Sequence, residues 1–151
     1  MSAWLGKYKS KAAMIADLGN IIIGQLARTT RQISTATLAP GASVSGTVSL
    51  GRSFHLVKLV ASADCWFRLY STNAAMLADS GRLITADPTP GSGVLCDLYP
   101  SGAVLTLPLS PPIWGASLET SPSPNITYLI TNMGASSVAL TLTLTYLVLE
   151  Q

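Results

Sequence analysis

The sequence predicts a mainly β fold: a jelly-roll-like antiparallel β-sandwich of about eight strands, with a helical or extended N-terminal anchor segment. Three observations lead to this prediction. Residues 137–150 alternate apolar and mostly threonine side chains, as expected for one long strand with a buried face. From residue 36 onward, turn signals recur roughly every eight to twelve residues, the spacing of sandwiches and jelly rolls. Only residues 11–27 show an extended helical pattern.

The composition indicates one domain whose surface is largely covered. The chain has 151 residues, which suits a single domain with an appended segment. Charged residues make up 11% of the chain, against about 25% in average soluble domains. A surface with so few charges is a poor monomer surface, so we expect copies of the same chain or other partners to cover it. No apolar run approaches the roughly twenty residues of a membrane span, so we expect no membrane insertion.

Residues 1–33 are predicted to form a docking segment and residues 34–151 the head domain. Within the segment, four apolar residues recur at helical spacing, but Gly19 and Gly24 each weaken a helix by about 1 kcal/mol. A helix of this length is marginal alone in water and needs a partner surface. Residues 29–35 are polar and β-prone and indicate a strand-like connector. The predicted anchor residues are Trp4, Tyr8, Met14, Leu18, Ile22 and Leu26.

The N-terminal segment is basic and the remainder mildly acidic. Before Ser34, the five cations Lys7, Lys9, Lys11, Arg28 and Arg31 face only Asp17. Nucleic-acid binding is one interpretation. We favour docking to a protein, because the cations are few and spread thinly, and we expect no nucleic-acid partner.

The N-terminus lacks a hydrophobic stretch followed by a small-residue cleavage site, so nothing indicates secretion. Cys65 and Cys96 lie in strand-like runs and could pair. We interpret them instead as buried free thiols of a protein made in a reducing cytoplasm.

The head domain divides into eight strand-like stretches separated by turns, with one short helix. In residues 65–71, Cys65 would face the core while Trp66 would lie on the opposite face. A short helix over residues 72–80 can be capped by Thr72 or Asn73 and ended by Gly81. A loop rich in proline and glycine follows. The predicted strands are 44–50, 54–61, 65–71, 94–99, 103–109, 113–119, 126–132 and 137–150.

The last predicted strand should complete the sheet, with nothing following it. One face carries Val138 to Val148 at every second position and should join the core. The other face is threonine-rich but ends in Leu147 and Leu149, more apolar than a solvated face. We therefore predict that these two leucines contact a neighbouring subunit.

Few residues could carry catalytic chemistry, so we expect no enzyme, no cofactor and no metal. His55 is the only histidine, and metal or acid–base sites need clusters of such residues. Asp79 and Asp87 flank Arg82, and a glycosidase uses two carboxylates about 5–10 Å apart. We favour a structural interpretation in which Asp79 and Asp87 pair with Arg82 or Arg68 and organise the long loop.

Several aromatic residues are predicted to lie at the surface, namely Trp66, Tyr70, Trp114, Tyr99 and Tyr128. All five are candidates to stack on the sugar rings of a glycan, and the first three, or the Asp79–Asp87 loop, are the predicted contacts. The alternative is that some belong to the core and others to subunit contacts, where Trp and Tyr are enriched.

Residues 54–150 resemble small tail-associated proteins of tailed bacteriophages. The resemblance rests on W-F-R-L-Y-S-T-N, then A-D-S-G-R, A-D-P and G-V-L, closing on T-L-T-Y-L with L-E. It implies a β-sandwich component of a tail fibre or baseplate, and such fibre proteins commonly form trimers. N-terminal residues lie outside it.

We therefore predict a structural virion protein, assembled in the host bacterial cytoplasm. It would form a homotrimer and dock on another tail or baseplate protein through its N-terminal segment. The alternatives are a carbohydrate-binding module for host glycans, or a capsid decoration or head–tail joining protein.

Overall fold

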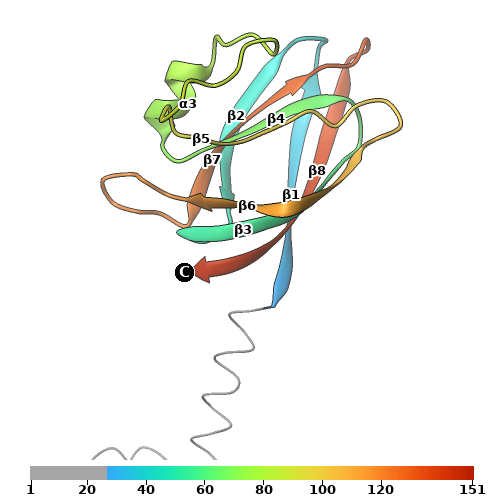
Figure 1. Cartoon of the computed structure of the whole chain (residues 1–151). Helices are drawn as coiled ribbons and strands as arrows, with labels where there is room; N and C mark the ends of the chain where they lie inside the picture. Colours follow the sequence, from blue (N-terminus) through green and yellow to red (C-terminus); the bar gives the residue numbers. More distant parts are fainter. Residues whose placement is uncertain (1–26) are drawn as a thin grey trace, which may run out of the picture.

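The computed structural model describes residues 27–151 (Figure 1). The helix predicted over residues 11–27 therefore lies almost entirely outside the described residues. So do all six predicted anchor residues: Trp4, Tyr8, Met14, Leu18, Ile22 and Leu26.

The described residues form eight strands and one short helix. Their bounds are β1 Arg28–Leu38, β2 Ser43–Ser49, β3 Ser53–Ala61, β4 Cys65–Tyr70, α3 Asn73–Asp79, β5 Val94–Leu98, β6 Thr106–Ala116, β7 Asn125–Asn132 and β8 Val138–Glu150. The strands make two four-stranded antiparallel sheets, in the orders β1-β8-β3-β6 and β2-β7-β4-β5. The first strand pairs with the last, the second with the seventh, the third with the sixth and the fourth with the fifth. This nested pairing is a jelly roll, so the predicted fold class is confirmed.

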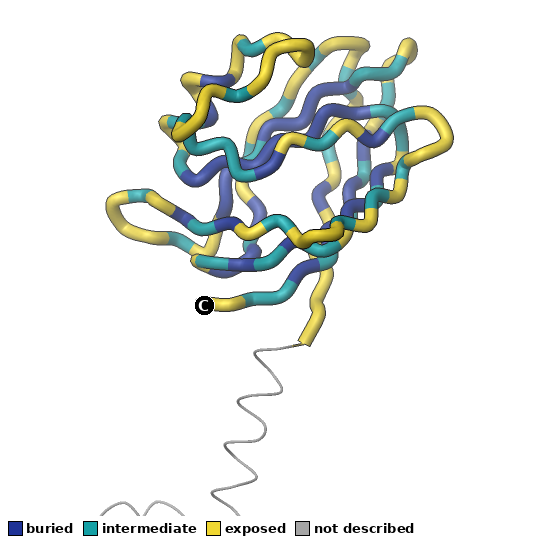
Figure 2. Tube along the Cα trace, viewed as in Figure 1, coloured by how far each residue is buried: buried dark blue, intermediate teal, exposed yellow. Residues whose placement is uncertain are grey.

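The core lies between the two sheets and is built by alternation along each strand. On β8, Leu140, Leu142 and Leu144 are fully buried, while the threonines between them are only partly covered (Figure 2). β8 lies between β1 and β3, so it fills an interior position of its sheet. Its length and buried face are as the alternation predicts.

The sandwich begins earlier than the predicted boundary at residue 34. β1 starts at Arg28, and residues 28–33 pair with β8 in continuous register, from Arg28 opposite Leu147 to Ile33 opposite Leu142. Ile33 is buried in the core. The head therefore includes residues 28–33, because this stretch supplies the outermost strand of a sheet and not a connector.

The single strand β6 takes the place of two predicted strands, 103–109 and 113–119. Proline cannot donate a ladder hydrogen bond, so it is confined to edge strands or bulges. β6 is an edge strand, and its register with β3 shifts between Leu56 and Lys58. One strand can therefore carry Pro108, Pro111 and Pro112.

α3 packs on the outer side of the β2-β7-β4-β5 sheet. The hydroxyl of Thr72 accepts a hydrogen bond from the backbone N–H of Ala75 at 3.0 Å, which confirms the predicted cap. Met76 packs with Tyr70 of β4 and Leu129 of β7 in a second apolar cluster. All six residues of β4 are buried as a result, because the core covers one face and the helix with its following loop covers the other.

The two cysteines are buried free thiols, as predicted. The residue of β4 that lies opposite Cys96 is Leu69. Cys65 lies four residues before Leu69 on the same strand, which places it about 13 Å along the ladder from Cys96. A disulfide needs Cα atoms within about 7 Å, so this register excludes a bond between them. Burial raises the pKa of the Cys65 thiol to about 12 and raises that of Cys96 as well. In residues 27–151, no helix has the length and apolar character needed to cross a bilayer.

Candidate functional site

The outer faces of the two sheets differ, and each holds some of the residues singled out in the sequence. The face covered by α3 centres on Arg68, whose side chain is 1% exposed. The guanidinium carbon lies 3.6 Å from the centre of the Trp66 ring. Its nitrogens lie 3.5 Å from the Asp79 carboxylate and 3.2 Å from the Thr131 hydroxyl. A cation so deeply buried needs such partners, because desolvation would otherwise disfavour its charge.

Asp79, the last residue of α3, receives donors from three directions. The Tyr70 hydroxyl donates to it at 2.7 Å, and Nε of Arg82 donates at 2.7 Å. Burial by itself would raise the pKa of Asp79. The hydrogen bonds from Arg82 and Tyr70, with the charges of Arg82 and Arg68, outweigh burial and lower it. The carboxylate is thus held in its charged form.

Arg82 connects the loop to the sheet. It pairs with Asp79, donates to the Ala86 carbonyl at 2.6 Å, and pairs with Asp97 of β5 at 2.6 Å. The hydrogen bond to Asp79 is the main cause that raises the Arg82 pKa. Nε1 of Trp66 donates to Asp97 as well. Sheet, helix and loop are therefore tied by one polar network.

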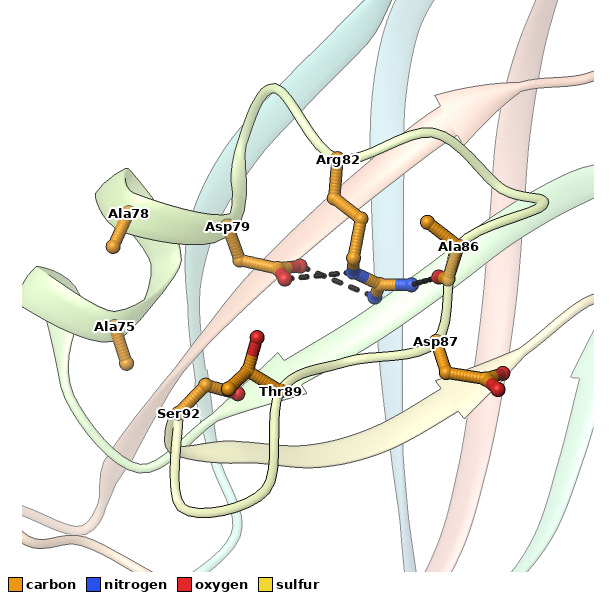
Figure 3. Close-up of a pocket in the computed structure, with 8 residues that line it drawn as sticks. All are labelled: Ala75, Ala78, Asp79, Arg82, Ala86, Asp87, Thr89 and Ser92. Carbon is orange, nitrogen blue, oxygen red and sulfur yellow. Dashed lines mark hydrogen bonds and ion pairs between the residues drawn. The ribbon is translucent and has the colours of Figure 1, made fainter.

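The predicted loop-organising residues Arg68, Asp79 and Arg82 lie together in this network, but Asp87 does not belong to it. Figure 3 shows the Asp87 side chain pointing away from Arg82 at the rim of a cavity of about 410 Å³. The second carboxylate that pairs with Arg82 is Asp97, because the pairing of β5 with β4 places Asp97 beside Trp66 and Arg68. Sequence proximity to Arg82 favoured Asp87, whereas only the sheet register identifies Asp97.

Two of the three predicted glycan contacts are wrong. Trp66 is 5% exposed and Tyr70 is fully buried, since α3 and the loop fold over them. Neither ring can stack on a sugar. Trp114 on β6 is 68% exposed and is accessible, as predicted.

Among residues 27–151, no helix packs on the outer face of the β1-β8-β3-β6 sheet, which we call the uncovered face. α3 packs against β4 and β7 of the other sheet. The strand register sets one row across all four strands: Arg28 lies opposite Leu147, Leu147 opposite His55, and His55 opposite Trp114. The next row holds Thr30, Thr145, Lys58 and Pro108. These eight residues include no carboxylate.

Leu147 and Leu149, the predicted subunit contacts, belong to this uncovered face. Leu147 is half-buried among its cross-strand neighbours, and Leu149 is 45% exposed near the end of β8. The structure brings Trp114 into the same row as Leu147, separated only by His55. The sequence predicted different roles for Trp114 and Leu147, because the two residues lie 33 positions apart in the chain.

The described residues offer no group of His, Cys, Asp and Glu side chains that could hold a metal ion. On the row of the outer face, His55 lies between Leu147 and Trp114. On the covered face, the carboxylates of buried Asp79 and of exposed Asp97 both pair with Arg82. The polar network on that face holds the helix and its loop against the sheet.

Comparison with known proteins returned no matching family model and no matching curated protein. The function of the protein is therefore inferred from its fold and from the two outer faces of the sandwich.

Proposed function

We propose that this protein is a structural, non-enzymatic virion protein of a tailed phage, either a short tail fibre or a baseplate-attached component. Its jelly-roll heads assemble with one another, as a homotrimer, through the uncovered face of the β1-β8-β3-β6 sheet. Residues 1–27 attach the assembly to another tail protein.

One observation chiefly supports the proposal: the uncovered face carries Leu147 and Trp114 in one row, and neither this row nor the next contains a carboxylate. Exposed apolar surface on a folded domain marks an association site. Tryptophan is among the residues that contribute most at such sites. Jelly rolls also occur widely in viral shells and lectins, which is an analogy of fold and supports the role only weakly.

The association surface is tested by Leu147→Asp combined with Leu149→Asp. Both side chains point away from the core, so the head should stay folded while two buried charges oppose assembly. Native mass spectrometry of the wild type should show an oligomer, and of the variant a species with fewer subunits. An intact oligomer with the double substitution would place the interface elsewhere.

The attachment role is tested by deleting residues 1–27. A deletion to residue 33 would remove half of β1, so the cut must precede Arg28. We expect a folded head, with unchanged circular dichroism, that no longer joins the particle. Incorporation of the shortened chain would refute the anchor. Imaging labelled particles also separates the tail from the head, where a decoration or joining protein would lie.

A second candidate function is binding of a host-surface glycan, favoured by the 68% exposure of Trp114. Aromatic rings with an apolar face and a polar edge suit such contacts. A glycan array tests this candidate with three proteins: the wild type, Trp114→Phe and Trp114→Ala. The phenylalanine variant keeps an aromatic ring at this position, and the alanine variant does not. Absence of any glycan signal would leave association as the role of this residue.

A further inference from the structure

A groove runs between the outermost strands of the two sheets, β1 and β2. Two adjoining cavities, of about 410 and about 350 Å³, share the lining residues Arg31 and Ser49. The first lies at the start of β1 beside Tyr146 and Val148, and the second lies farther along β1 beside Tyr128. At the floor of the groove, the Tyr146 hydroxyl donates a hydrogen bond of 3.1 Å to the carbonyl oxygen of Ser49.

One wall of the groove is a free strand edge. β1 pairs only with β8, and within the described chain no backbone hydrogen bond joins residues 28–34 to any other segment. Alternate N–H and C=O groups of an edge strand point outward and can receive another strand. The edge at β6, in contrast, carries Pro108, Pro111 and Pro112, which cannot donate hydrogen bonds there. Of the two edges of this sheet, β1 is the one suited to strand addition.

The groove combines this edge with pockets for side chains. Added strands gain affinity from main-chain hydrogen bonds and specificity from pockets for alternate side chains. Tyr146, Tyr128 and Ile33 give the groove apolar surface, and Arg31 gives it positive charge. Its occupant should therefore be extended, apolar and free of cations.

Residues 18–27 of this chain, L-G-N-I-I-I-G-Q-L-A, meet these requirements. They form an uncharged stretch, and the β-branched run at residues 21–23 favours a strand. The segment joins β1 directly, so it is present near every groove. Lys7, Lys9 and Lys11 lie well before it and would not oppose Arg31.

The same segment is poorly suited to enter the groove of its own chain. Folding back on β1 with a tight hairpin would put Leu26 and Ala27 at the two turn positions, where Asn-Gly or Gly-containing pairs are preferred. A parallel alignment would need a crossover of about a dozen residues. A second copy supplies the strand without either problem.

We propose that the groove between β1 and β2 receives residues 20–26 of a second copy of this chain, added as a strand to β1. This deepens the proposed function by naming a second contact between subunits. It leaves residues 1–19 for attachment to the particle.

Chemical cross-linking of the full-length chain tests the proposal. Ile22→Cys and Arg31→Cys are placed in separate chains that differ in mass by a tag, mixed and oxidised. The native thiols of Cys65 and Cys96 are buried and stay protonated, so they should not react. We expect a disulfide-linked heterodimer, at several times the yield obtained with Leu77→Cys in place of Arg31→Cys. Leu77 is 62% exposed on α3, which packs on the other sheet.

A yield equal to the Leu77→Cys control would overturn the proposal, and so would a link found only within one chain carrying both Ile22→Cys and Arg31→Cys. Adjacent residues of a strand face opposite ways, so Ile23→Cys is tested beside Ile22→Cys. The proposal requires that at least one of these two variants forms the cross-link to Arg31→Cys. Repeating the reaction with Leu147→Asp and Leu149→Asp separates the two contacts. Loss of the outer-face interface alone should leave this cross-link in place.

Discussion

The two sheets of this jelly roll both bury their inner faces in the core, but their outer faces differ. The outer face of β4 and β7 is covered by α3 and its loop, and carries a buried arginine with its carboxylate. The outer face of β8, β3 and β6 carries threonine, leucine and tryptophan beside His55 and Lys58, and no helix of residues 27–151 packs on it. The comparison shows that the buried charges of the first face fasten the chain's own loop. For the second face we propose association.

The largest effect should follow from Asp79→Asn on the covered face. The substitution leaves Arg68 buried without its counter-charge and weakens the contact with Arg82. Removing one partner of a buried pair costs about 3–5 kcal/mol. Urea denaturation should show this loss in the free energy of unfolding.

The control for Asp79→Asn is Glu150→Gln, which breaks the ion pair with Arg52. That pair spans 3.9 Å, and its side chains are 47% and 62% exposed. Exposed pairs contribute about 0–1 kcal/mol. Equal losses for the two variants would contradict the view that the covered face depends on its buried charges.

A smaller effect is expected from Trp114→Ala on the uncovered face. Truncating an interface tryptophan that acts as a hot spot costs about 2 kcal/mol, so the dissociation constant of the oligomer should rise about thirtyfold. The free energy of unfolding of the monomer should hardly change, because the ring is 68% exposed. Sedimentation at a series of concentrations measures the association.

Leu118→Ala is the matched control for Trp114→Ala. Leu118 is 70% exposed but lines a cavity beside the proline- and glycine-rich loop, away from the row that contains Leu147. Its removal should leave the oligomer intact. If Leu118→Ala weakened association as much as Trp114→Ala, the interface would not follow the sheet face.

The smallest effect should appear in the pH dependence of stability. The pKa of Asp79 is lower in the folded protein than in the unfolded chain, where it is about 3.9. The ionised Asp79 carboxylate therefore adds fully to the free energy of unfolding at a pH well above its unfolded pKa. This contribution is lost as the pH falls through about 4 toward the lower pKa of the folded protein. The difference in unfolding free energy between wild type and Asp79→Asn should narrow over this range. A constant difference from pH 6 to pH 3 would show that the charge of Asp79 does not carry the effect.

Much of the fold could be predicted because its signals are local. Alternation along residues 137–150 identified β8 and its buried face, and Thr72 identified the start of α3. Asp79 with Arg82 could be predicted because three residues separate them on one helical turn and its continuation. Residues 28–33 were misassigned because a polar, threonine-rich stretch resembles a connector until its pairing with β8 is known.

The sequence by itself determined which side chains share a face, because the period of two is a property of the backbone and needs no partner. It could not determine what covers each face. Trp66 and Trp114 both lie on strands, yet Trp66 is buried with Arg68 and Arg82 over its ring, and Trp114 is exposed. Only the tertiary structure decided this, since the covering segment and the registers that join Asp97 to Arg82 and Trp114 to Leu147 depend on residues distant in the chain.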